Sequence, residues 1–402
     1  MKKRIVAATL LALGVQQVYA QSSVTLYGLI DDGVNYINNV QTAGKSAHGK
    51  ASLVFLSSGV LQGDRWGLRA IEDLGGGLQA IGVLESGWDL NTGAMQQGGA
   101  QFGRQAFIGL GSSVGTVTLG RQYDLLLDFI SPTTSALWGG SYVAHISDID
   151  NLNNTYRVNN ALKFKSQPVG GVTIGAMYSL GGVAGDVTRN QLFGGGASYA
   201  FGSLYVGIGY MNARDPNVSV YGGNPSGGGA KVNNIGATTL AGVQGNPAVS
   251  GYASAHSKGI LAIGGTYTIG TGKIIANYSN VRFKGLGDVS AGPNPLGYGG
   301  SATLNTAEVG YYQYVTPTLL LGGGYVFTKA NNAGGNLAKY HQGQIGADYF
   351  LSKRTDLYAT LVFQKASGTD STGQQAVASI NGVTPSSSDC QMLVRLGIRH
   401  KF

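Results

Sequence analysis

Cysteine, charge and long apolar runs are all scarce in this sequence of 402 residues. The single cysteine, Cys390, excludes an intramolecular disulfide, so no covalent cross-link holds the fold. Charged residues make up 11% of the chain, well below the roughly 25% that is usual in soluble globular proteins. Beyond residue 20 no apolar run approaches the about 18 residues that suggest a membrane-spanning helix. The chain therefore does not resemble an ordinary soluble protein or a helical membrane protein.

The first twenty residues have the pattern of a secretory signal peptide. A basic start, MKKR, precedes an apolar run, IVAATLLALGV, and VYA places small residues before a cleavage point. An N-terminal membrane anchor is the alternative, but the apolar run is too short to span a bilayer. We therefore expect residues 1–20 to be a signal peptide. Its removal takes away Lys2, Lys3 and Arg4 and no acid, which lowers the formal charge from +8 to +5.

What the sequence has in abundance is glycine, with 67 residues, and a hydrophobic pattern of period two. Apolar side chains alternate with polar or small ones in sixteen segments, which is typical of β-strands. Transmembrane strands need about 9–11 residues each, and bacterial single-chain barrels use an even number of them. The segments span 24–34, 64–73, 78–88, 102–110, 116–124, 159–166, 172–180, 192–201, 204–211, 258–269, 273–283, 305–315, 319–327, 341–351, 356–364 and 392–402.

The connections between these segments alternate in length. Short turns are expected at 73–77, 111–115, 167–171, 201–203, 270–272, 315–318 and 352–355. Long polar or glycine-rich segments lie between them, among them 37–62, 214–257, 285–301 and 367–388. Short turns on one rim and long loops on the other are typical of outer-membrane barrels. The pattern predicts an all-β fold, a 16-stranded antiparallel transmembrane β-barrel that occupies residues 21–402.

Several segments resemble one known family. They are VTLYGLIDDGV (24–34), the block from Arg65 to Tyr123, RVNNALKFKS (157–166) and the ending RLGIRHKF (395–402). These segments are similar to the general diffusion porins of Gram-negative outer membranes, particularly the β-proteobacterial branch of the Neisseria and Burkholderia type. The resemblance implies a homotrimer of sixteen-stranded barrels, in which the third external loop folds inward and narrows each channel.

The same resemblance implies location and partners. The protein is expected in the outer membrane, among lipid and lipopolysaccharide, where it conducts ions and small hydrophilic solutes passively. The terminal Phe402 resembles the assembly signal of the family, which the outer-membrane insertion machinery reads. We expect 392–402 to be the sixteenth strand and to pair with 24–34, so that the sheet closes.

The third loop is expected at about 123–156. It begins with DLLLDFI, an apolar and acidic piece that could form a helical turn. Enteric members of the family carry a glutamate near the loop tip, whereas this sequence has ALWGG there. The negative charge of the constriction would then come from Glu85, whose strand parity is inward, and from four loop aspartates. Those aspartates are Asp124, Asp128, Asp148 and Asp150.

Three arginines are the candidates for the cationic wall of the constriction. A channel performs no bond chemistry, so its working residues are charges directed into the narrow part of the lumen. Parity places Arg65 inward, and it places Arg104 inward if Phe107 faces lipid. Arg157 opens the strand after the third loop, and by resemblance all three match the arginine cluster of the family. The alternative is that they lie on the rim or form structural ion pairs.

Arg121 has different parity. The side chains of Val117 and Leu119 are expected to point out of the barrel, so Arg121, which has the same parity, would share the lipid or subunit face. A solvated rim position is one interpretation. A possible subunit interface is the other, because a neighbouring chain could supply a partner for the charge.

Enzymatic and nucleic-acid functions have little support in the sequence. The five histidines fall on different segments without ligand spacing, and the glycine runs lack the lysine of a phosphate-binding loop. The cations are dispersed along strands rather than gathered in one basic patch. We therefore expect no catalytic residue, no metal, no cofactor and no nucleic-acid partner.

The sequence thus predicts a general outer-membrane porin with weak to moderate anion selectivity. A substrate-specific porin of the same fold is the first alternative. A plugged structural or adhesive barrel is the second, although no plug domain is evident in the sequence.

Overall fold

The computed structural model describes residues 22–42, 51–222, 234–236, 246–331, 333–335 and 337–402. The expected signal peptide, 1–20, lies outside these residues. The first strands are β1 (Ser23–Val40), β2 (Ala51–Ser58), β3 (Arg65–Gly75), β4 (Leu78–Ser86), β5 (Gln105–Gly111), β6 (Gly115–Gln122), β7 (Arg157–Ser166), β8 (Val172–Ser179) and β9 (Leu192–Phe201). The others are β10 (Leu204–Arg214), β11 (Tyr221–Gly222), β12 (Ser257–Ile269), β13 (Gly272–Leu286), β14 (Gly300–Thr316), β15 (Leu319–Asn331), β16 (Leu337–Phe350), β17 (Thr355–Ser367) and β18 (Cys390–Lys401).

The helices are short. They are α1 (Leu125–Phe129), α2 (Ala136–Gly139) and the 3-10 turns Gln97–Gly99, Ser131–Thr133, Ser141–Val143, Ile146–Asp148, Ser250–Tyr252 and Ala333–Gly335. None of the helices in the described residues is long and apolar enough to cross a membrane.

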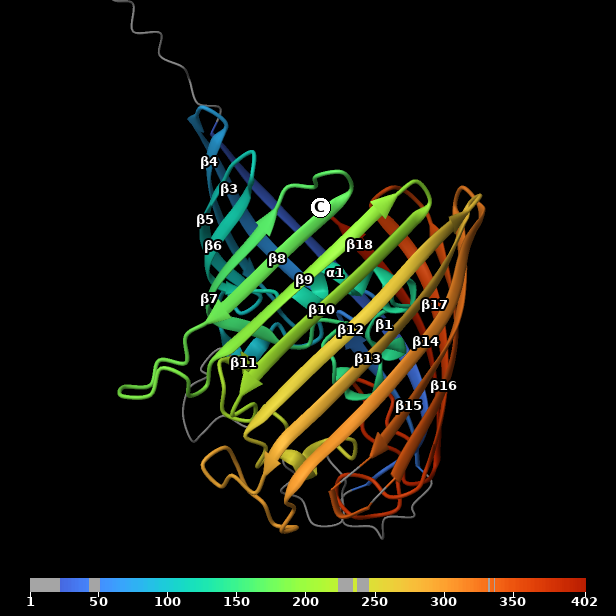
Figure 1. The fold of residues 1–402 in the computed structure, drawn as a ribbon. Helices are drawn as coiled ribbons and strands as arrows, with labels where there is room; N and C mark the ends of the chain where they lie inside the picture. Colours follow the sequence, from blue (N-terminus) through green and yellow to red (C-terminus); the bar gives the residue numbers. More distant parts are fainter. Residues whose placement is uncertain (1–21, 43–50, 223–233, 237–245, 332, 336) are drawn as a thin grey trace, which may run out of the picture.

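The strands form one closed antiparallel sheet, in which β1 pairs with β18 (Figure 1). β2 and β3 pair with the two halves of β1, so together they make one barrel strand that is interrupted at 59–64. β11 is a two-residue pairing onto the start of β7. Counted this way the eighteen segments give sixteen barrel strands, and the predicted 16-stranded barrel is confirmed.

The short turns gather at one end of the barrel and the long loops at the other, the lower end in Figure 1. The predicted loop 37–62 is wrong in part. β1 extends to Val40, and β2 pairs with its second half, because the backbone groups of a long strand need partners. Residues 59–64 leave the wall, and there the Val60 carbonyl accepts a hydrogen bond of 2.8 Å from the Ser141 amide of the third loop.

The period-two pattern sorts side chains between the two faces of the wall. In β12, Leu261 and Ile263 are 44% and 45% exposed on the outside, whereas Ile260 and Ala262 are buried inside. Alternate residues of a strand point to opposite faces, so a single strand presents an apolar stripe to lipid and packs its other face inward. Here the inner face carries the buried core, because part of the lumen is filled by the third loop.

Candidate functional site

The third loop runs from the end of β6 to the start of β7, residues 123–156, and turns into the barrel, where α1 lies behind the front wall in Figure 1. Asp124 starts α1, and its side chain accepts a hydrogen bond of 3.0 Å from the Leu127 amide. Leu125, Leu126 and Phe129 of α1 are buried. The predicted helical turn in DLLLDFI is therefore confirmed.

Glycines in the wall let this loop lie directly against the strands. A Cβ added at Gly175 of β8 would come within 3.0 Å of the Phe129 ring, and one at Gly207 of β10 would lie 2.0 Å from the Phe129 carbonyl oxygen. A Cβ at Gly322 of β15 would lie 2.6 Å from the Trp138 ring. Bare backbone at these positions sets how closely the loop approaches the wall.

A buried polar cluster fastens the loop to the wall. His145 contacts Asp150 through Nδ1, at 2.6 Å, and Glu308 of β14 through Nε2, at 3.1 Å. Glu308 also accepts hydrogen bonds from the Ser135 amide, at 2.8 Å, and from the Asn277 side chain, at 2.6 Å. Both carboxylates are thus paired with His145 in the interior, where an unpaired charge would be costly.

The three predicted arginines come together on the wall formed by β3, β5 and β7. Arg104 Nε lies 2.9 Å from Glu85 Oε1, and its Nη2 donates a hydrogen bond of 2.9 Å to the Tyr123 hydroxyl. The guanidinium of Arg157 lies 5.6 Å from the centre of the Tyr123 ring. Arg65 donates one hydrogen bond, of 3.0 Å, to the Gly63 carbonyl.

Arg104 reaches this cluster by a route that strand parity did not predict. The placement of Phe107 on the lipid side is wrong, because Phe107 lines a cavity inside the barrel. Gln105 is opposite Glu85 in the ladder, and the Arg104 amide also donates to the Glu85 carbonyl, at 3.1 Å. Two residues opposite one is a β-bulge, which turns Arg104 inward.

A cavity of about 690 Å³ lies between the arginines, the third loop and the ends of β14, β15, β16 and β18. Its charged lining residues are Arg65, Arg104, Arg157, Arg399, Lys401 and Asp348. The third loop, all of which is described, lines it with apolar, hydroxyl and amide side chains such as Trp138, Ser141 and Asn153. The surface of the cavity is therefore predominantly cationic.

A second cavity of about 870 Å³ lies beside it along β3 to β8. Tyr123 lines both cavities, so it marks the boundary between them. The sequence analysis did not single out Tyr123, and the only signal was its place at the start of the third loop. The charged residues of the second cavity are Arg69, Lys163, Lys165 and Asp128.

The predicted acidic side of the constriction needs correction. Asp124, Asp148 and Asp150 are at most 1% exposed, are buried within the loop or between the loop and the wall, and do not line the cavity. Asp148, for example, accepts hydrogen bonds from the Asn153 and Thr155 amides, at 2.9 and 3.0 Å. Burial raises the pKa of Asp124 and Asp148 above its ordinary value. These carboxylates shape the loop and do not contact passing ions.

The remaining two acids are paired with cations. Asp128 faces the second cavity, where it forms an ion pair of 2.5 Å with Lys163. Glu85 lies on the arginine wall beside Arg104 and not across the channel from it. The prediction that Glu85 and the loop aspartates face the arginines is therefore wrong, because each acid finds a nearer partner.

Arg121 is 8% exposed, and partners within its own chain bind it. Its Nε donates a hydrogen bond of 2.7 Å to the Gly103 carbonyl, and its Nη1 donates to the Asn159 side chain. The charge does not need a neighbouring subunit to supply a partner. Its place at a subunit interface stays a prediction.

The last strand closes the barrel as predicted, since β18 pairs with β1. Phe402 exchanges two backbone hydrogen bonds of 3.0 Å with Gly28, and its ring is half-exposed. Arg395 is fully buried at the seam against Asp31 and Tyr358.

Comparison with known proteins agrees with this architecture. A family model described as Gram-negative porin matches residues 7–369. The chain belongs to the Gram-negative porin family. An outer membrane porin protein of Bordetella pertussis is 35% identical to this porin over 220 residues. The match covers 53% of this chain and 57% of the Bordetella protein. Outer membrane porin protein 32 of Delftia acidovorans is 28% identical over 100% of both chains.

Solved structures share the fold of this porin. An anion-selective porin from Comamonas acidovorans superposes with a TM-score of 0.69 at 22% identity and covers 95% of this chain and 100% of its own. The trimer form of OmpT from Vibrio cholerae has a TM-score of 0.61 at 18% identity, with coverage of 95% and 99%. The protein is thus an outer-membrane porin, as the sequence predicted.

Proposed function

We propose that this porin is a general diffusion channel that prefers anions. The observation that carries the proposal is the lining of the first cavity, where five cationic side chains accompany one acid, Asp348. A lumen lined by charge of one sign raises the local concentration of ions of the opposite sign. The anion-selective porin from Comamonas acidovorans has a similar fold and supports the same preference.

The cationic side chains of this cavity differ in whether an acidic side chain of the protein already neutralises them. Arg399 is paired with Asp356 at 2.8 Å and Arg104 with Glu85 at 2.9 Å. Arg157 is buried, and its Nε has no hydrogen-bond partner among the described residues. Among the described residues, Arg65 donates to one backbone carbonyl. Arg65, Arg157 and Lys401 form no ion pair among the described residues, so they are the groups best able to attract a passing anion. Arginine in addition keeps its charge when it is crowded.

The solutes and partners follow from the same reasoning. Ions and small hydrophilic solutes fit a polar lumen that keeps two cavities beside the third loop. A homotrimer in outer-membrane lipid and lipopolysaccharide is supported by the trimer form of the Vibrio cholerae relative. Phe402, at the seam of the barrel, is proposed as the signal for the insertion machinery.

Reversal potentials in planar bilayers test the proposal. Under a salt gradient the wild-type channel should give a potential of the sign that means preferential anion flow. A potential of the cation-selective sign would overturn the preference. If one solute blocks the current and the block saturates as its concentration rises, a substrate-specific porin is favoured. Absence of conductance would favour a plugged barrel.

A further inference from the structure

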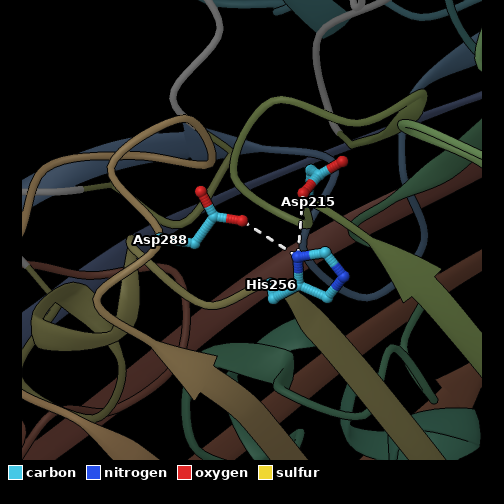
Figure 2. A group of neighbouring side chains, drawn as sticks. All are labelled: Asp215, His256 and Asp288. Carbon is cyan, nitrogen blue, oxygen red and sulfur yellow. Dashed lines mark hydrogen bonds and ion pairs between the residues drawn. The ribbon is translucent and has the colours of Figure 1, made fainter. Parts of the chain in front are cut away.

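Three metal-ligating side chains meet at the long-loop rim, away from both cavities of the lumen (Figure 2). Asp215 directly follows β10, His256 directly precedes β12, and Asp288 lies just beyond the end of β13. His256 Nδ1 is 2.9 Å from Asp288 Oδ2 and 3.8 Å from Asp215 Oδ1. Figure 2 shows both carboxylates directed at this one ring nitrogen.

The backbone holds the three residues in place without any ligand. β12 pairs with β10 on one side and with β13 on the other, so the three strand ends are neighbours. The Asp215 amide donates to the His256 carbonyl, at 2.8 Å, and the His256 amide donates to the Gly285 carbonyl, at 3.2 Å. The Asp288 amide donates to the Ser254 carbonyl, at 3.1 Å. A preorganised arrangement of this kind favours binding, because little order has to be created when the ligand arrives.

Asp215 forms the buried side of this cluster. Asp215 is 3% exposed, and its Oδ2 accepts a hydrogen bond of 3.2 Å from the Asn190 amide. Its Oδ1 is directed at His256 Nδ1, but 3.8 Å is too long for a hydrogen bond. A single ring nitrogen can donate only one proton, and Asp288 is nearer to it. A cation placed between the three side chains would be bound by this oxygen, by Asp288 Oδ2 and by His256 Nδ1.

We propose that Asp215, His256 and Asp288 bind a divalent transition-metal ion of the zinc class. Tetrahedral zinc, with bonds of about 2.0–2.2 Å to nitrogen and oxygen, places its ligand atoms about 3.3–3.5 Å apart. The observed distances of 2.9 and 3.8 Å lie on either side of that value, and all three ligand atoms are within 4.8 Å of one another. The imidazole nitrogen favours such an ion over calcium or magnesium, which prefer oxygen ligands only.

The bound metal takes the place of a proton on Nδ1, and the proton stays on Nε2 at the far side of the ring. Water completes the fourth position of the metal. The ion joins the two ends of loop 215–256 to the start of loop 287–299, so it fastens two external loops at the mouth of the channel. This site could not be predicted from the sequence, because its ligands lie on three separate segments.

Calorimetric titration of the folded full chain in detergent, stripped of metal by a chelator, tests the proposal. With zinc chloride we expect one ion per chain, and with calcium chloride no comparable binding. His256→Ala and Asp288→Asn should each weaken zinc binding by at least the about 10–100-fold that changes around a metal site commonly cause. Cobalt should give a visible absorption band with wild type and not with His256→Ala.

Asp186→Asn is the matched control, since Asp186 is an external-loop aspartate that accepts hydrogen bonds from its own turn. It should bind zinc like wild type. The formation of conducting channels in bilayers shows that each variant has folded. Equal zinc binding by wild type and both ligand variants, no zinc binding, or equally tight calcium binding would each overturn the proposal. In those cases His256 forms only an ion pair with its neighbours.

Discussion

His145 of the third loop lies 3.1 Å from Glu308 on the barrel wall, and this contact joins groups that are 163 positions apart in the sequence. Burial alone would lower the pKa of His145, but Asp150 and Glu308 outweigh it and hold the pKa well above its ordinary value. The imidazole is therefore charged at neutral pH. The depth of the third loop depends on this ion pair as well as on apolar packing.

Replacing His145 with alanine should loosen the third loop. The change leaves Asp150 and Glu308 buried without their cation, and breaking a buried pair by removing one partner costs about 3–5 kcal/mol. We expect faster amide exchange over 131–150 in hydrogen-exchange mass spectrometry and noisier single-channel currents. His341→Ala, at an exposed histidine on β16, is the control and should leave both unchanged. Unaltered exchange in His145→Ala would show that packing alone holds the loop.

Arg104→Ala should shift ion selectivity toward cations. One unit charge about 4 Å from an ion is worth about 1 kcal/mol in water, or about fivefold in local concentration. The shift in selectivity should exceed the effect of losing one positive charge. Arg104 lies 2.9 Å from Glu85, so its removal also leaves the negative charge of Glu85 without its partner. The double variant Arg104→Ala/Glu85→Gln should recover part of the preference. Reversal potentials measure the ion selectivity of each variant. Arg354→Ala, in a short turn, is the control, and equal effects of Arg104→Ala and Arg354→Ala would contradict the prediction.

Gly207→Ala should displace the third loop. The added Cβ would lie 2.0 Å from the Phe129 carbonyl oxygen, so α1 has to move. Overpacking of this kind costs about 1–3 kcal/mol, which should lower the thermal midpoint and change the single-channel conductance. Gly343→Ala on β16 is the control, because its Cβ meets nothing within 4 Å. The explanation based on close approach fails if the two variants behave alike.

Arg395→Leu should destabilise the seam of the barrel. Arg395 Nη2 lies 3.3 Å from Asp31 and its Nε 2.7 Å from the Tyr358 hydroxyl, and both charged groups are fully buried. Loss of the cation alone should cost about 3–5 kcal/mol, and the double variant Arg395→Leu/Asp31→Asn should recover part of it. Urea unfolding in lipid vesicles measures the free energies. An additive double variant would mean that the two groups act independently.

Loop 368–389 should become less stable as the pH rises from about 4 to above 6. Burial raises the pKa of Asp370 to about 6, while its pKa in the unfolded chain is about 3.8. The folded state therefore binds more protons in this window, and the cost of the ionised carboxylate is fully present above pH 6. Amide exchange over 368–376 should quicken with this pH change beyond its intrinsic pH dependence. In Asp370→Asn this additional pH dependence of amide exchange should vanish. If it persists, a titratable group other than Asp370 causes it.

The strands, turns and bounds of the third loop could be predicted from the sequence because they depend on local pattern. An alternating stripe such as that of β12 points to a membrane strand wherever it occurs, and turns such as 201–203 follow from their own residues. The prediction failed over 37–62, where pairing with β1 decides that 51–58 is a strand. That pairing is a contact between segments and leaves no periodic signal of its own.

The charges of the site were only partly predictable, for a related physical reason. Arg65 and Arg157 reach the cavity by position, whereas Arg104 reaches it through a bulge that parity does not show. The loop aspartates looked like a negative wall in the sequence, yet the amides around Asp124 and Asp148 draw them into the interior. The sequence by itself thus determined the barrel and its family, since period, length and turns are local. Only the tertiary structure decided which charges face the lumen, because each charge takes the nearest partner that the closed barrel brings to it.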